Sequence, residues 1–394
     1  MPTEAAFFFA GLLFVAAALG YVFARLGQLD EEESGRSGLD YIRGLKFLLK
    51  EQPDRALEAF TGPGELDEDT IETHFALGQL FRRRGEVERA IRVHRDLIER
   101  PNLRRERREQ AQFALAEDYL SAGLFDRAEA LLAELRDSRR QGTEALNRLI
   151  HLAELTHEWE RAIELHRELE AVDRSAARSG RIAHYFCELA EQARQERDLP
   201  RAGAWLDRAE QARPDSLRVS LLKAAVAADA GDHEQAIRCY RRVAAHEPSL
   251  LVDVLPRLSA ACKAGGREAD FSRFLADLLA QDPHAARAVA FATILDPAID
   301  EPRAIACLRD FIRGDATLQA LVDTERLEGA PAAVQAATLE RVRRALRGMA
   351  KAGQTYRCLE CGYASASLQW QCPGCAAWDV VRPRVRLAFG SEDR

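Results

Sequence analysis

Residues 202–248 read AGAWLDRAEQARPDSLRVSLLKAAVAADAGDHEQAIRCYRRVAAHEP, and they contain a clear internal repeat. Ala202 is followed by Ala236 at the same spacing that separates Pro214 from Pro248. Self-similarity at one fixed period indicates an architecture built from stacked repeats.

The same pattern extends along the chain in both directions. Each unit has a small residue, a bulky residue three positions on, a turn, an alanine twelve positions after the small residue, and an apolar residue four positions later. Ala56 to Ala90 and Ala128 to Ala162 repeat the same spacing. Such a period, about 34 residues, is that of the tetratricopeptide repeat, a pair of antiparallel helices that approach closely at the small residues. Several independent occurrences of one spacing disfavour an ordinary irregular helical domain.

Six units are clear, with marker residues Gly44, Phe47, Ala56 and Phe60; Gly78, Phe81, Gly85 and Ala90; Ala116, Tyr119, Gly123, Ala128 and Leu132; Ala162; Ala190, Ala202, Leu206 and Pro214; and Ala224, Gly231, Ala236, Tyr240 and Pro248. A seventh unit around Ser259 is degenerate, because Phe271 stands where the small residue belongs. Residues 296–348 are expected to continue as helices in weaker register. The apolar pattern of residues 331–352 predicts one helix. Its expected apolar stripe consists of Val334, Ala337, Leu339, Val342, Ala345 and Leu346.

Near the C-terminus stand two Cys-x-x-Cys pairs, Cys358 with Cys361 and Cys372 with Cys375. Each pair places two sulfurs on one tight turn, and a short hairpin can bring the two turns together. The spacing therefore predicts a four-thiolate metal site, and tetrahedral sulfur suits both zinc and iron.

Glycine and aromatic residues flank these cysteines. Gly362 and Gly374 are expected to take positive φ and to direct amides at the sulfurs. Tyr356, Trp370 and Trp378 would supply the apolar interior of a module of about 30 residues, which is too small to fold without a metal. It is also too small to bury all three rings, so we expect the module to dock on the repeat array.

A pair of disulfides is the alternative for the four C-terminal cysteines, and it would require an oxidising compartment. The remaining cysteines argue against that compartment, because they lie singly in helical patterns and read as small buried hydrophobes. These are Cys187, Cys239, Cys262 and Cys307.

The N-terminal region predicts a membrane anchor. Residues 5–23 are nineteen uncharged, mostly apolar positions, and as a helix they would span roughly 28 Å of a ~30 Å hydrocarbon core. We therefore expect an uncleaved transmembrane helix in residues 1–24, a linker in 25–39, repeats in 40–350 and the metal module in 351–394. The basic residues nearest the span follow it, which predicts a cytoplasmic body; they are Arg25, Arg36, Arg43 and Lys46.

Composition and motifs indicate a protein-binding role. The net charge of −7 disfavours a general nucleic-acid binder, and repeats of this kind commonly hold a peptide on their concave face. Arg82–Arg84 and Arg100–Arg108 read either as solvated surface or as a contact for anionic headgroups or an acidic partner. The sequence carries no phosphate loop, nucleophile elbow or clustered carboxylate pair, so we expect no enzyme activity.

An anchor, a repeat array and a Y-R-C-x-x-C-G…W-x-C-P-x-C-x-x-W module, in that order, resemble the lipopolysaccharide assembly protein B family of Gram-negative bacteria. The likeness covers the whole chain. It implies an all-α tetratricopeptide-repeat superhelix with an N-terminal transmembrane helix and a small rubredoxin-like metal ribbon, in a single-pass inner-membrane protein. The implied ligands are Cys358, Cys361, Cys372 and Cys375, with one iron ion favoured and zinc as the alternative.

The resemblance also implies a function. Members of that family restrain lipopolysaccharide synthesis by promoting destruction of the lipid A deacetylase, together with the membrane-anchored AAA+ metalloprotease FtsH. The chain would then be a non-enzymatic adaptor that concentrates a soluble client at the membrane. Two alternatives remain open: a scaffold for other lipopolysaccharide synthesis or export enzymes, and electron transfer through a four-cysteine iron centre.

Overall fold

The computed structural model describes residues 68–173, 180–314, 334, 337, 340, 341, 343–347 and 355–384. These residues belong to two compact units, divided within helix α8, and each unit is described by itself. The expected anchor at residues 5–23 and the repeat at 44–60 lie outside the described residues. In the described part, no helix has both the length and the apolar character needed to cross a bilayer.

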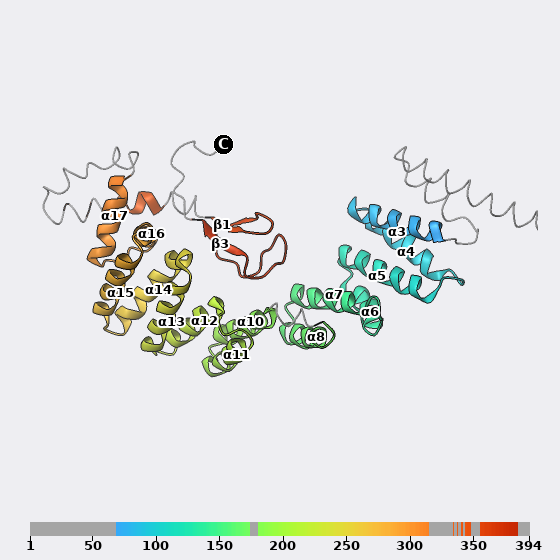
Figure 1. Ribbon diagram of the computed structural model, residues 1–394, viewed down its shortest axis with the longest axis horizontal. Helices are drawn as coiled ribbons and strands as arrows, with labels where there is room; N and C mark the ends of the chain where they lie inside the picture. Colours follow the sequence, from blue (N-terminus) through green and yellow to red (C-terminus); the bar gives the residue numbers. More distant parts are fainter. Residues whose placement is uncertain are drawn as a thin grey trace, which may run out of the picture. The chain divides into compact units, whose positions relative to one another are not determined.

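The first unit is built from successive helices that pack pairwise (Figure 1). In order they are α3 (Glu68–Arg83), α4 (Val87–Glu99), α5 (Arg105–Ser121), α6 (Phe125–Leu135), α7 (Gly142–Leu155) and the later part of α8 (Trp159–Val172). The start of α8 belongs to the second unit.

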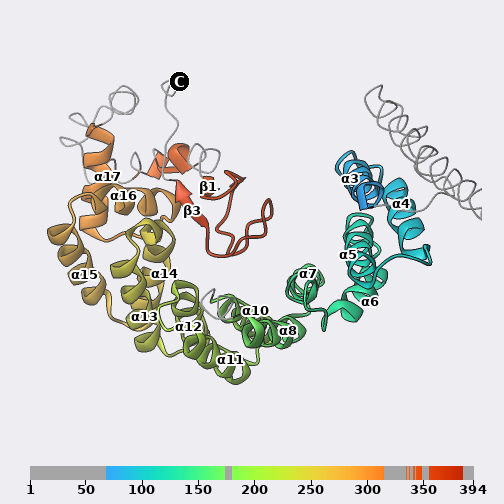
Figure 2. The same ribbon diagram turned by 45° about the vertical axis from the view of Figure 1, so that its right-hand side comes forward.

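The second unit continues the helix pairs and ends in a small ribbon of strands. Its helices are α10 (Arg181–Gln195), α11 (Leu199–Ala212), α12 (Leu217–Asp229), α13 (His233–His246), the 3-10 turn η1 (Pro248–Leu250), α14 (Leu251–Ala264), α15 (Glu268–Gln281), α16 (Ala285–Leu295) and α17 (Pro302–Gly314). Figures 1 and 2 both place β1 and β3 inside the curve formed by α10 to α14.

Small residues mark the closest approaches between paired helices, as the repeat pattern predicts. The repeat alanines have no exposed surface; they are Ala90, Ala128, Ala162, Ala202 and Ala236. Gly78 shows the reason, because a Cβ built there would lie under 3.0 Å from the imidazole of His94 on α4. Phe271 is buried in the degenerate repeat, so that unit keeps its core with a larger side chain.

A left-handed residue follows the first helix of a repeat and ends it. Gly85 and Gly231 both have φ of 79°, and the amide of the next residue bonds the carbonyl five residues earlier. This is the Schellman arrangement, which favours glycine. His157 and Arg197 take the same conformation with φ of 58° and 64°, so two repeats keep the turn without a glycine.

The prediction that an apolar stripe of residues 331–352 is buried is wrong in part. Leu346 is buried, but the side chains of Val334, Ala337 and Ala345 are exposed. Arg343 of this segment is buried instead. Its guanidinium donates hydrogen bonds to the carbonyl oxygens of Thr293 (3.2 Å) and Ile299 (2.8 Å). A helix leaves its last carbonyls without internal partners, and the guanidinium bonds one of these, that of Thr293, together with a carbonyl in the segment that follows α16.

The C-terminal ribbon is an antiparallel sheet with strand order β2-β1-β3. Its strands are β1 (Thr355–Cys358), β2 (Ala364–Ser365) and β3 (Val381–Arg384). Tyr356 pairs with Ser365 on one side and with Pro383 on the other. The central strand β1 therefore delivers the first cysteine of the module at its C-terminal end.

Candidate metal centre

The structure brings together the four cysteines predicted as ligands. Their sulfur atoms all lie within 4.8 Å of one another, and Cys358 Sγ lies 3.7 Å from Cys375 Sγ while Cys361 Sγ lies 3.6 Å from Cys372 Sγ. Four sulfurs at ~2.3 Å from a central ion form a tetrahedron with edges of about 3.8 Å. The observed distances therefore fit one tetrahedral ion, and they do not distinguish iron from zinc.

The structure does not support the disulfide alternative, because these sulfurs lie 3.6 and 3.7 Å apart, well beyond a disulfide bond of about 2.05 Å. The hairpin instead places the sulfurs of one turn opposite those of the other. The module is therefore a four-cysteine metal-binding site.

Each Cys-x-x-Cys turn, which we call a knuckle, directs backbone amides at its sulfurs. The amide of Cys361 lies 3.5 Å from Cys358 Sγ, and the amide of Gly374 lies 3.4 Å from Cys372 Sγ. These dipoles disperse the negative charge of thiolates. The amide of Cys361 is the largest influence on Cys358 and lowers the pKa of that thiol to about 6. The amide bonds to this sulfur therefore favour its thiolate form, which is the form that binds a metal ion.

The two expected glycines have different roles. Gly362 follows the second cysteine of its knuckle and has φ of 75°, as expected. In the second knuckle the equivalent residue is Ala376, with φ of 56°, so the prediction for Gly374 was wrong. A Cβ at Gly374 would lie 3.3 Å from both Cys361 Sγ and Tyr363 Cβ, a tight contact, so a larger residue there would press on the sulfur.

The ribbon docks on the helices of the second unit, as we predicted because the module is too small to bury its own aromatic rings. The ring of Trp378 stacks on His184 of α10 with centroids 5.0 Å apart, and it meets Tyr185 edge-on at 5.9 Å. It also meets Trp159 edge-on at 6.3 Å, within the part of α8 that belongs to this unit. The docking surface thus combines α8, α10 and the second knuckle.

Charged groups complete the docking surface. Arg218 of α12 is 5% exposed, and its guanidinium carbon lies 5.5 Å from the Trp378 ring centroid and 5.8 Å from that of Trp370. Its nitrogens donate to the carbonyl of His184 and to Glu188, so the buried cation is compensated. Burial and the neighbouring arginines lower the pKa of His184 to about 3, so its ring is neutral against Trp378.

A hydrogen bond fixes the first strand of the ribbon. The Tyr356 hydroxyl donates to Asp253 Oδ1 on α14 over 2.5 Å. Burial raises the pKa of Asp253, and the bond from Tyr356 acts in the opposite direction. On the other side, Arg213 and Asp379 form an ion pair of 3.4 Å.

Sequence reasoning predicted the four cysteines that the structure brings together and the three rings beside them, but it missed the partners of those rings on the repeats. No spacing rule points to His184, Arg218 or Asp253, because each lies in an ordinary helical segment. The signal that could have found Arg218 is its place among apolar positions of α12, where an unpaired arginine is unfavourable.

The four cysteines outside the module mostly behave as predicted. Cys187, Cys262 and Cys307 are buried, whereas Cys239 is only half-buried. Burial raises the pKa of Cys187 to about 12, so that thiol is unreactive at neutral pH.

Family models match the ribbon and two stretches of the repeats. The family described as "Rubredoxin metal binding domain" matches residues 356–383, and families described as "Tetratricopeptide repeat" match residues 73–109 and 219–249. Among solved structures, the MamA protein has 16% identity and a TM-score of 0.32, covering 45% of this chain and 94% of its own. A tetratricopeptide repeat protein from Parabacteroides merdae has 12% identity and a TM-score of 0.34, covering 61% and 91%.

Relatives of known name cover nearly the whole sequence. Lipopolysaccharide assembly protein B of Escherichia coli (strain K12) is 32% identical over 377 residues, which is 94% of this chain and 96% of that protein. The protein of the same name from Haemophilus influenzae is 28% identical over 395 residues, with 94% and 96% coverage. On this identity and coverage, the chain belongs to the lipopolysaccharide assembly protein B family.

Proposed function

We propose that this chain is a non-enzymatic adaptor of the bacterial inner membrane that regulates lipopolysaccharide synthesis. It would bring the lipid A deacetylase to the membrane-anchored protease FtsH. The observation that carries the proposal is the relation to lipopolysaccharide assembly protein B over 94% of the chain. The repeat fold supports it, since stacked helix pairs offer binding surface.

Membrane attachment is the second part of the proposal. The apolar residues 5–23 would anchor the chain with its body on the cytoplasmic side. Anchoring confines adaptor and protease to one surface, which raises the effective concentration of a captured client. The test is alkaline extraction of membranes together with a reporter fused to the C-terminus. Release of the full chain into the soluble fraction would contradict the anchor.

The third part assigns Cys358, Cys361, Cys372 and Cys375 as ligands of one ion, with iron favoured over zinc by the family likeness. The bound ion would supply structural cross-linking of the two knuckles. The ribbon and its helices would then act as one body, because Trp378 and Tyr356 join the knuckles to the repeats. Elemental analysis of the purified chain gives both the stoichiometry and the identity of the metal.

The decisive experiment follows the deacetylase in cells after protein synthesis is stopped. In cells lacking this chain the deacetylase should persist, and the full chain should restore rapid loss only when FtsH is active. A chain lacking residues 1–24 should not restore it. Unchanged deacetylase half-life, with several other lipopolysaccharide enzymes co-purifying, would instead identify the scaffold.

A further inference from the structure

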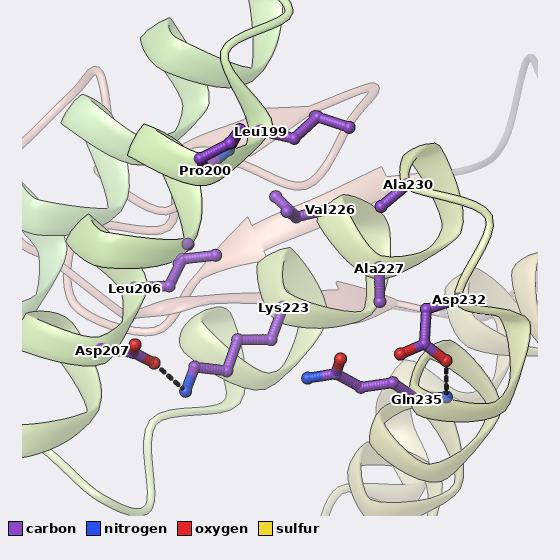
Figure 3. A pocket seen from close by; sticks show the side chains of 11 residues that line it. Leu199, Pro200, Leu206, Asp207, Lys223, Val226, Ala227, Ala230, Asp232 and Gln235 are labelled. Atoms are coloured by element: carbon purple, nitrogen blue, oxygen red, sulfur yellow. Dashed lines mark hydrogen bonds and ion pairs between the residues drawn. The ribbon is translucent and has the colours of Figure 1, made fainter.

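A groove of about 400 Å³ opens between α11, α12 and α13 in the second unit (Figure 3). Its apolar lining includes Leu199, Leu206 and Val226. Gly203 lies on α11 between the two leucines and also lines the groove.

The groove exists because one side chain that fills other repeats is missing here. Gly203 directly follows the repeat alanine Ala202. In three other repeats the residue after that alanine is a buried isoleucine, with exposed fractions of 8%, 5% and 3%; these are Ile91, Ile163 and Ile237. In the remaining described repeat with this alanine, the residue after Ala128 is the half-buried Glu129, so every other such repeat carries a large side chain at this position and only this one has glycine.

The wall of the groove that α12 forms also lacks the bulky apolar side chains found in another repeat. In the first unit, Ile91 of α4 packs against Leu115 and Tyr119 of α5 in one buried cluster. With the small repeat residues of α5 and α12 aligned, the residues of α12 at those two places are Lys223 and Ala227, and both line the groove. Three bulky apolar groups are thus replaced by a glycine, an alanine and a lysine.

The fold does not require this glycine. A Cβ built at Gly203 meets no atom within 4 Å, and its φ lies outside the left-handed range. Glycine in a helix interior is disfavoured relative to alanine, so the position gives up helix stability without any gain in packing. A local choice that lowers stability without a packing reason is expected at functional sites.

The charges around the groove indicate what would enter it. Figure 3 shows Asp207 and Asp232 on opposite sides, with Lys223 reaching Asp207. The Lys223 ammonium lies 2.9 Å from Asp207 and 2.7 Å from Glu210, so its charge is already compensated. One oxygen of Asp232 caps α13 through the amide of Gln235, and its carboxylate faces an exposed edge. The rim therefore favours a cation.

We infer that this groove receives one aliphatic side chain of a partner polypeptide, with a lysine or arginine beside it. The aliphatic group takes the place that Ile91 fills between α4 and α5, and the cation lies against the exposed carboxylate of Asp232. The inference does not depend on the proposed function, so either can fail without the other.

The probe is a short peptide of glycine and serine that contains photo-leucine followed by arginine. After illumination with the full chain in lipid nanodiscs, mass spectrometry should map the cross-links to α11, α12 and α13. Burial of one leucine side chain corresponds to roughly tenfold or more in affinity, and Gly203→Ile should reduce the yield by that factor. Replacing arginine by glutamate in the peptide should lower the yield severalfold at low salt and less at high salt.

Matched variants keep the test decisive. Gly203→Ile should fold with an unchanged or higher thermal midpoint, whereas Ile91→Gly should lower it, because only Ile91 has packing to lose. Gly203→Ala should retain most cross-linking. The inference is overturned by cross-links elsewhere, by equal yields from wild type and Gly203→Ile, or by failure of Gly203→Ile to fold. Equal yields from the arginine and glutamate peptides would overturn the choice of a cationic partner.

Discussion

Trp378→Ala should release the ribbon from the repeats without removing its metal. The ring contacts His184, Tyr185, Trp159 and Arg218, and none of the four cysteines is changed. Truncation of a buried Trp costs about 3–5 kcal/mol, and Trp378 is only partly buried, so we expect about 2–3 kcal/mol. At about 1.4 kcal/mol per factor of ten, the undocked population should rise roughly 30- to 150-fold.

Hydrogen exchange on the full chain measures this change. The amides of His184 and Tyr185 belong to the two α10 residues that the Trp378 ring contacts, and they should exchange faster in Trp378→Ala, by up to the same factor. Leu359→Ala is the matched control, because that side chain is 72% exposed on the first knuckle. Equal exchange in wild type and Trp378→Ala would show that the ribbon is an independent appendage. Loss of metal from the variant would also refute the reasoning, because it would place the ring in the support of the knuckle.

Three further predictions concern the ribbon and the repeat core. Cys372→Ser should lose the metal and unfold the ribbon, so elemental analysis should fall to zero and exchange should quicken in α10, α12 and α14; retained metal would contradict the ligand set. The pKa of Asp253 is raised in the folded state above its ordinary value of 3.8. The stability that Asp253 contributes to the folded state is therefore greatest below pH 3.8 and declines as pH rises. The thermal midpoint of wild type relative to Asp253→Asn should therefore fall between pH 4 and pH 7, and a constant difference would refute this. Gly78→Ala should destabilise the first unit by about 1–3 kcal/mol, seen as a lower midpoint in thermal unfolding, because the new methyl group would collide with His94.

Periodic and local features could be predicted from the sequence. The repeat spacing located the buried alanines such as Ala90 and Ala236, because a small residue is needed wherever two helices cross closely. The paired cysteines located the metal centre, because two sulfurs three positions apart share one turn. The failures came from contacts with no sequence period. Asp253 meets a tyrosine 103 residues away, and Arg343 bonds carbonyls at 44 and 50 residues' distance.

The second knuckle shows another reason why sequence alone falls short, because its positive φ is at a residue that the sequence did not indicate. Glycine is the residue expected there, but the chain places Ala376 in the left-handed conformation and Gly374 in a crowded one. Sequence alone identifies a glycine without revealing whether torsion or space requires it. The structure shows crowding at Gly374, because a built Cβ would lie 3.3 Å from Cys361 Sγ, and it shows no positive φ there.

The 103-residue separation between Asp253 and Tyr356 has a consequence for biosynthesis. Helix pairs are local, so the repeats can form while the ribosome is still adding residues, whereas the ribbon is made last. Until the ribbon has captured its ion, the aromatic surface of Trp159 and Tyr185 has no cover from Trp378. Chaperones and proteases act on chains with such uncovered apolar surface. Availability of the metal would then determine what fraction of newly made chains survives to maturity.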